Sequence, residues 1–127
     1  MGESRRGSVL VIEDDETLIA LFETILRQAG FHLRSATSAK AAQALLSHHH
    51  FDVVVCDLSV AGGVKVFELV KNLRKQHPEI AVLIVTGYTP EEIASEIASQ
   101  KLELMEKPFS PPELIKRVAM LAKRKAA

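Results

Sequence analysis

What this 127-residue sequence lacks narrows the classes of protein it can belong to. It has one cysteine, Cys56, so no disulfide can form within the chain. No apolar run approaches the roughly 20 residues that a membrane-spanning helix requires, and the opening MGESRRGS has no apolar segment of the kind that a secretory signal needs. We therefore expect a cytoplasmic protein in a reducing setting, without a membrane span.

The sequence also lacks a net charge. Its sixteen basic residues cancel its sixteen acidic ones, so no overall positive field attracts nucleic acid or an anionic membrane, and we expect no direct nucleic-acid binding. With 47% hydrophobic residues, a chain of this length can build one core. We expect a single domain over residues 8–124, a disordered tail at 1–7, and a tail or linker start at 125–127.

Short apolar runs alternate along the chain with amphipathic stretches. The runs have the length of strands and cover residues 8–13, 31–36, 51–57, 80–87 and 102–105. Each is followed by apolar residues at helical spacing, which predicts five helices. The central runs are apolar throughout rather than alternating, which is typical of strands buried on both faces. The pattern predicts an α/β fold, a doubly wound five-stranded parallel sheet with five helices.

Local signals mark several helix ends. In TPEE, Thr89 and Glu92 have the spacing of a capping box, and Ser110 and Glu113 repeat it in SPPE. Gly30 stands where the first helix is expected to stop.

Polar side chains follow the predicted strands at the edge where a doubly wound sheet has its functional crevice. Carboxylates crowd residues 13–16 after the first strand, Asp57 ends the third strand, Thr86 ends the fourth, and Lys107 follows the fifth. Crowded carboxylates oppose each other's ionisation, so the cluster favours a cation. An acidic run before a helix also has a simpler interpretation, which is capping of the helix and compensation of its dipole.

This set of groups has a chemical interpretation. Mg²⁺ binds in proteins through a few carboxylate oxygens, waters and phosphate oxygens. A carboxylate such as Asp57 can act as a nucleophile and accept a phosphoryl group as an aspartyl phosphate. Lys107 and the Thr86 hydroxyl would then stabilise the charge on the phosphoryl oxygens.

From about Val9 to Ala122 the chain resembles the receiver domain of two-component response regulators. The motifs that carry the resemblance are VIEDDE (11–16), FDVVVCDL (51–58), VLIVTGYT (82–89) and MEKPFSPPEL (105–114). The resemblance implies a flavodoxin-like, CheY-like fold with strand order 2-1-3-4-5. The phrases TGYTPEEI and EKPFSPPEL are also similar to receivers of hybrid sensor histidine kinases.

The resemblance implies a role for each matching position. Glu13 and Asp14 correspond to the family's acidic pair, and with Asp57 and the backbone carbonyl of Ser59 they would bind Mg²⁺, for which Mn²⁺ could substitute. Asp15 and Glu16 are then assigned to the start of the next helix.

The remaining matches concern phosphorylation itself. Asp57 corresponds to the phosphoacceptor, Thr86 to the switch hydroxyl and Lys107 to the invariant lysine, whose bond to Pro108 is expected to be cis.

The implied function is that of a phosphoacceptor receiver domain in a two-component phosphorelay. A histidine kinase or a histidine phosphotransfer protein would donate to Asp57. The added charge would then change a surface formed by the fourth helix, fifth strand and fifth helix, where an output domain or a downstream protein docks. The resemblance thus implies a signalling module rather than an enzyme, although Mg²⁺-dependent self-phosphorylation from a donor and slow autodephosphorylation are expected.

Two alternatives belong to other classes. A receiver-like interaction module could work without phosphorylation, but it would not need to keep all of Glu13, Asp14, Asp57, Thr86 and Lys107. A phosphatase that forms an aspartyl phosphate favours a second aspartate two residues after the nucleophile, and this chain has Ser59 there.

Some features depart from the family or have simpler interpretations. Leu104 stands where relatives carry an aromatic residue, and AGGVKV (61–66) differs from the usual loop after the phosphoacceptor. The histidines at 48–50 are expected to close a helix rather than to bind metal. Cys56, inside a strand, is expected to be buried and inert.

Overall fold

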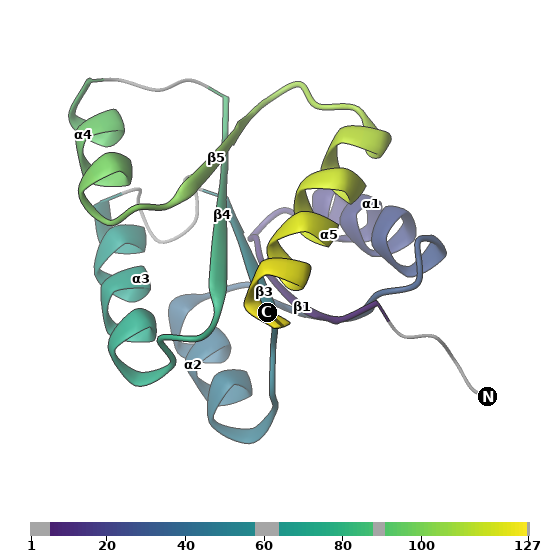
Figure 1. Cartoon of the computed structure of the whole chain (residues 1–127), viewed down its shortest axis with the longest axis horizontal. Coiled ribbons are helices and arrows are strands. Elements are labelled where there is room, and N and C mark those ends of the chain that lie inside the picture. Colours follow the sequence, from purple (N-terminus) through teal and green to yellow (C-terminus); the bar gives the residue numbers. More distant parts are fainter. Residues whose placement is uncertain (1–5, 58–63, 88–90, 127) are drawn as a thin grey trace.

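Five parallel strands form one sheet in this computed structural model, which describes residues 6–57, 64–87 and 91–126 (Figure 1). The strands are β1 (Ser8–Ile12), β2 (His32–Ala36), β3 (Val53–Asp57), β4 (Ala81–Thr86) and β5 (Glu103–Glu106). Their order across the sheet is β2-β1-β3-β4-β5, and every neighbouring pair is parallel. The predicted fold and strand order are confirmed.

Helices cover both faces of the sheet. They are α1 (Glu16–Gln28), α2 (Ala39–His48), α3 (Val64–Gln76), α4 (Glu91–Ser99) and α5 (Pro111–Ala126). Figure 1 shows α1 and α5 on one side of the sheet and α2, α3 and α4 on the other. Within the described ranges, no helix has both the length and the apolar character that crossing a membrane requires.

The central strands carry two cores at once. In β1, Val9 and Val11 pack under α1 and α5, whereas Leu10 and Ile12 face the cluster under α2, α3 and α4. Each strand of this kind must be apolar at every position, which explains the continuous aliphatic runs. At the edge of the sheet, β2 exposes alternate residues instead.

Several predicted helix ends are confirmed. The Ser110 hydroxyl accepts a hydrogen bond from the backbone N–H of Glu113 at 3.2 Å, so it caps α5. At the end of α1, Gly30 has φ of 101°, a left-handed conformation that favours glycine. There the N–H of Phe31 donates to the Leu26 carbonyl at 3.0 Å. The expected capping residue Thr89 lies outside the described residues.

Asp52 joins three strands at the edge where they begin. Its Oδ2 accepts from the Ser8 N–H at 2.9 Å, and its own N–H donates to the Ser8 carbonyl at 2.8 Å. Its carbonyl accepts from the Ala81 N–H at 3.1 Å. These bonds fix the starts of β1, β3 and β4 relative to one another.

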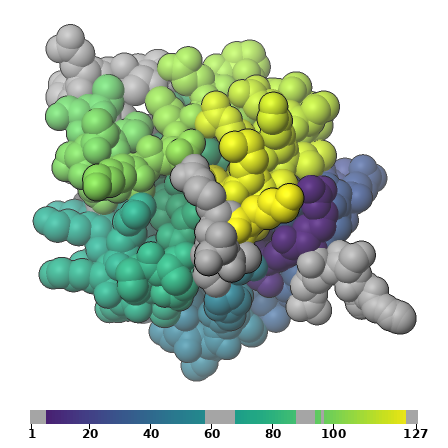
Figure 2. All heavy atoms as spheres, in the orientation of Figure 1, coloured from purple at the N-terminus to yellow at the C-terminus, as the bar shows by residue number. Residues whose placement is uncertain are grey.

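Arg6 and Gly7, expected in the disordered tail, belong structurally to the domain. The Arg6 N–H donates to the Gly30 carbonyl at 3.0 Å, and the Gly7 carbonyl accepts from His32 at 2.9 Å. The Arg6 guanidinium lies 5.2 Å from the ring centre of Phe31, a cation–π distance. Figure 2 shows the first described part of the chain, in purple, beside α5, in yellow. The domain therefore includes these two residues, while residues 1–5 lie outside the described part.

Candidate functional site

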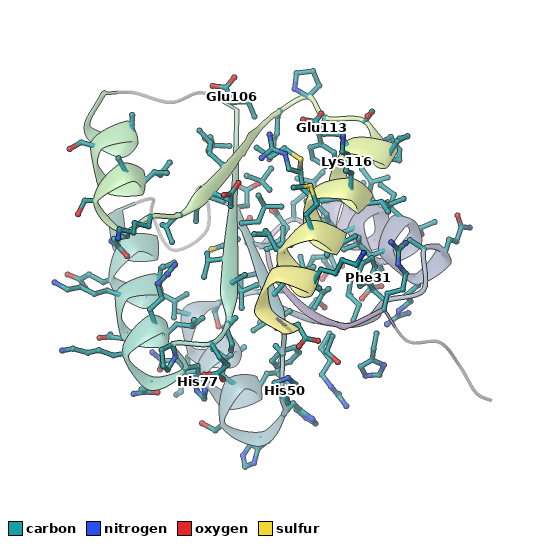
Figure 3. The ribbon with its side chains drawn as sticks, in the orientation of Figure 1. Phe31, His50, His77, Glu106, Glu113 and Lys116 are labelled. Atoms are coloured by element: carbon teal, nitrogen blue, oxygen red, sulfur yellow. The ribbon has the colours of Figure 1, made fainter. Side chains whose placement is uncertain are left out.

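Four polar side chains that the sequence singled out lie at the carboxyl edge of the sheet. Glu13 directly follows β1, Asp57 and Thr86 end β3 and β4, and Lys107 directly follows β5. Figure 3 shows Glu106, which precedes the lysine, at the opposite end of the molecule from His50. The strand ends therefore gather residues from four distant segments.

The Lys107 side chain reaches across the sheet edge to Asp57. Its Nζ lies 2.5 Å from Asp57 Oδ2, and the Asp57 side chain is only 4% exposed while that of Lys107 is 29% exposed. The backbone N–H of Lys107 donates to the carbonyl of Thr86 at 2.7 Å. Lys107 is thus attached to β4 through its backbone and to β3 through its ammonium group. The bond between Lys107 and Pro108 is cis, as expected.

Glu13 is almost completely buried, with 1% of its surface exposed. Its Oε2 accepts from the backbone N–H of Asp15 at 3.0 Å, whereas no described residue donates to its Oε1. Burial, followed by the hydrogen-bonding contact with the Asp57 carboxyl, raises the pKa of Glu13 to about 7. Ionised carboxylates only accept hydrogen bonds, so two that lie together need a shared proton or a cation.

The carboxylates after Glu13 separate into different environments. Asp14 is exposed. Asp15 is the N-cap of α1, where its Oδ1 accepts from the N–H groups of Thr17 at 2.8 Å and Leu18 at 3.3 Å. Glu16 is the first residue of α1. The assignment of Asp15 and Glu16 to the helix start is confirmed.

The donor groups at this edge fit a hard divalent cation. Glu13 and Asp57 are buried neighbours. Among the described residues no group donates to Glu13 Oε1, and the pKa of the Glu13 carboxyl is raised. In the described part of the chain, no three His, Cys, Asp or Glu side chains group closely enough to hold a metal by themselves. Mg²⁺ typically keeps several waters and needs only one or two protein carboxylates. The expected carbonyl ligand at Ser59 lies outside the described residues.

Cys56, which precedes Asp57, and the histidines at 48–50, at the opposite end of the molecule (Figure 3), both have the environments that their simpler interpretations predicted. Burial, followed by the charges of Asp57 and Glu13, raises the pKa of Cys56 to about 12, so this buried thiol stays protonated and inert at neutral pH. The histidine tract closes α2, which ends at His48 with His49 as its C-cap.

The structure also shows contacts that the sequence did not single out. The ring of Phe109 stacks on that of Phe22, with ring centres 5.6 Å apart and planes 21° from parallel. Arg117 donates from Nη1 to the carbonyl of Leu104 at 2.9 Å and lies 3.8 Å from the Glu103 carboxylate. The sequence drew attention to Leu104 and to the segment that contains Phe109. It could not show that Phe109 contacts Phe22 or that Leu104 accepts a hydrogen bond from Arg117.

Comparison with known proteins gives a consistent family match. A family model described as the response regulator receiver domain matches residues 9–119. The alginate biosynthesis transcriptional regulatory protein AlgB of Pseudomonas aeruginosa is 28% identical over 111 residues, which cover 87% of this chain and 24% of that protein. The response regulator SaeR of Staphylococcus aureus is 27% identical over 117 residues, covering 91% of this chain and 50% of its own length. The chain therefore spans between a quarter and half of these curated relatives.

Solved structures of receiver domains are also similar to this chain. The receiver domain of the Francisella response regulator 1452 has a TM-score of 0.80 at 31% identity, covering 93% of this chain and 98% of that one. A receiver domain protein from Methanospirillum hungatei has a TM-score of 0.85 and covers 94% of this chain and 95% of its own. Its identity of 20% supports the fold alone.

Proposed function

This chain belongs to the response regulator receiver domain family of two-component signalling, and from that premise we propose that Asp57 is its phosphoacceptor. Asp57 would receive a phosphoryl group from a phosphohistidine on a histidine kinase or a histidine phosphotransfer protein. In this step a carboxylate oxygen of Asp57 forms a bond to phosphorus while the phosphorus–nitrogen bond of the donor breaks. The electron pair of that bond returns to the imidazole, and the product is an aspartyl phosphate.

The neighbours of Asp57 suit this chemistry. Phosphoryl transfer requires positioned charges that stabilise the phosphoryl oxygens, rather than further covalent partners. Lys107 supplies a cation whose Nζ already lies 2.5 Å from Asp57. It holds the nucleophile in place before the reaction and donates to the phosphoryl group afterwards.

We assign the metal role to Glu13, Asp14, Asp57 and the backbone carbonyl of Ser59. When bound, Mg²⁺ or Mn²⁺ would neutralise charge on the incoming phosphoryl oxygens. The buried pairing of Glu13 with Asp57 supports this assignment, because burial and the neighbouring carboxyl make ionised Glu13 unfavourable unless a cation is present.

The phosphorylated domain acts as a switch. The Thr86 hydroxyl, at the end of β4, donates to the phosphoryl group after a short inward movement. The outcome is a changed surface on α4, β5 and α5, which an output domain or a downstream protein reads. Slow hydrolysis of the aspartyl phosphate resets the domain, so it is a signalling module rather than an enzyme.

The observation that carries this proposal is the contact between Lys107 and Asp57 beside the buried carboxylate of Glu13. The test is incubation of the protein with acetyl phosphate and Mg²⁺, followed by intact mass measurement. We expect a gain of one phosphoryl group that requires the metal and disappears in Asp57→Asn.

A matched control residue, Asp52, lies at the other end of the same strand, β3. Asp52 lies just before β3 and Asp57 ends it, so Asp52→Asn removes a carboxylate from the opposite edge of the sheet. This variant should still gain the phosphoryl group. The proposal is overturned if wild-type protein gains no phosphoryl group, or if Asp57→Asn gains as much. In that case an interaction module that works without phosphorylation becomes the better account.

A further inference from the structure

Phe109 lies two residues after Lys107, in the turn between β5 and α5. Its half-buried ring stacks on the buried ring of Phe22 from α1, at 5.6 Å between ring centres. We propose that Phe109 is a positioning residue for phosphoryl transfer, which holds the Lys107 ammonium against Asp57 by anchoring this turn to α1. The inference rests on the proposed function of Asp57 and adds a residue to its machinery.

The turn that carries Lys107 is attached at both of its ends. Before the turn, the Lys107 N–H donates to the Thr86 carbonyl at 2.7 Å. After it, Ser110 caps α5 through the N–H of Glu113, at 3.2 Å. Phe109 supplies the anchor between these points, and it packs into the apolar cluster that α1 and α5 share. The position of the Lys107 backbone thus depends on contacts to β4, α5 and α1.

Phe22, the other ring of the stack, lies on α1, the helix that starts beside the acidic residues of the site. Helix α1 begins with the N-cap Asp15, whose own N–H holds the Glu13 carboxylate at 3.0 Å. Phe22 lies further along the same helix and is 1% exposed. The stack therefore joins the two sides of the site, with the lysine turn on one and the helix that follows Glu13 on the other.

Lys107 needs such an anchor because its side chain is flexible. A lysine carries its charge on a four-carbon stem, and a buried contact fixes that stem only when the backbone below it is fixed. Displacement of a catalytic group by about 1 Å can cost a large factor in rate. Loss of the stack should therefore slow phosphoryl transfer at saturating donor while leaving the donor concentration for half-maximal rate unchanged.

The test compares Phe109→Leu, which keeps apolar bulk and removes the stack, with Phe109→Tyr, which keeps the ring. With acetyl phosphate and Mg²⁺, we expect the maximal rate of Phe109→Leu to fall roughly two- to tenfold. Phe109→Tyr should restore most of the rate. Val118→Ala is the matched control, because Val118 is buried in the same cluster and on α5 but away from the turn. It should lower stability without lowering the rate.

A second measurement identifies the route of the effect. In a Lys107→Ala background, Phe109→Leu should cause no further loss of rate, because the group that it positions is absent. An equal loss in both backgrounds would overturn the inference, as would a Phe109→Leu protein that is folded and phosphorylated at the wild-type rate.

A third measurement does not depend on phosphorylation. The NMR signal of the Lys107 ammonium group should move toward that of a solvated lysine in Phe109→Leu and stay in place in Val118→Ala. An unchanged signal in Phe109→Leu would overturn the inference. If wild-type protein gains no phosphoryl group at all, the proposed function fails, while this signal still decides whether Phe109 positions Lys107.

Discussion

At the scale of single residues, the burial of Glu13 separates it from the carboxylates that follow it in the sequence. Glu13 is 1% exposed, whereas Asp14 is exposed to solvent. The resemblance to receiver domains implied that both would bind a metal together with Asp57. It could not predict that only Glu13 would be enclosed, because burial at a strand end depends on what packs there from other segments.

The pKa of Glu13 gives a prediction about pH. Its value is about 7 in the folded protein and about 4.5 when unfolded, so between these values the folded state binds more protons. The contribution of Glu13 to the free energy of unfolding of metal-free protein should therefore decrease as pH rises from about 4.5 to about 7. Urea unfolding at a series of pH values measures this slope.

Glu13→Gln provides the comparison, because glutamine cannot ionise. The difference in unfolding free energy between wild type and this variant should change across the same pH range, in favour of the variant at higher pH. A difference that stays constant with pH would contradict the environment assigned to Glu13. Added Mg²⁺ should reduce the change, since a bound cation favours the ionised carboxylate.

At the scale of elements, α1 and α5 show which features can be predicted from neighbouring residues in the sequence and which cannot. The capping residue Ser110 and the stop at Gly30 were predicted from sequence, because both act within a few residues of their own position. The stack of Phe109 on Phe22 was not, because the two rings belong to elements that meet only after the sheet has formed. The spacing of apolar residues identifies the apolar face of a helix, but it does not predict which residues of other elements that face will contact.

The N-cap of α1 gives a prediction that separates stability from chemistry. Asp15→Ala removes the acceptor for the N–H groups of Thr17 and Leu18, and should lower the free energy of unfolding by about 1 kcal/mol. Asp15→Asn keeps an oxygen acceptor and should lose much less. Both variants should still gain a phosphoryl group, because the backbone N–H that holds Glu13 remains. Loss of phosphorylation in folded Asp15→Ala would show that this carboxylate belongs to the site after all.

At the scale of the whole molecule, the end of the sheet where the strands begin and the end where they finish have different roles. The edge where strands begin is fixed by Asp52, which bonds to Ser8 and Ala81. The edge where they end carries Glu13, Asp57 and Lys107. The strand order was implied by the resemblance to receiver domains, whereas the α/β pattern alone predicted that the functional groups would lie where the strands end. It gave no sign that Asp52 joins three strands.

The strand-start edge can be tested through Asp52→Ala. Its Oδ2 accepts from the Ser8 N–H at 2.9 Å, and loss of this partly buried bond should lower the free energy of unfolding by about 1 kcal/mol. Asp52→Asn retains an acceptor and should be closer to wild type. Denaturant unfolding measures both. A fully stable Asp52→Ala would mean that the bond makes no net contribution to the sheet.

The central claim is that Asp57 itself carries the phosphoryl group, and locating that group is the most direct test. After reaction with acetyl phosphate and Mg²⁺, borohydride reduces an aspartyl phosphate to the corresponding alcohol and releases phosphate, which marks the residue permanently. Peptide mass spectrometry should then find the reduced residue at position 57 in wild type and at no position in Asp57→Asn. Unmodified Asp57, with the phosphoryl group on another residue such as a histidine of the 48–50 tract, would contradict the account.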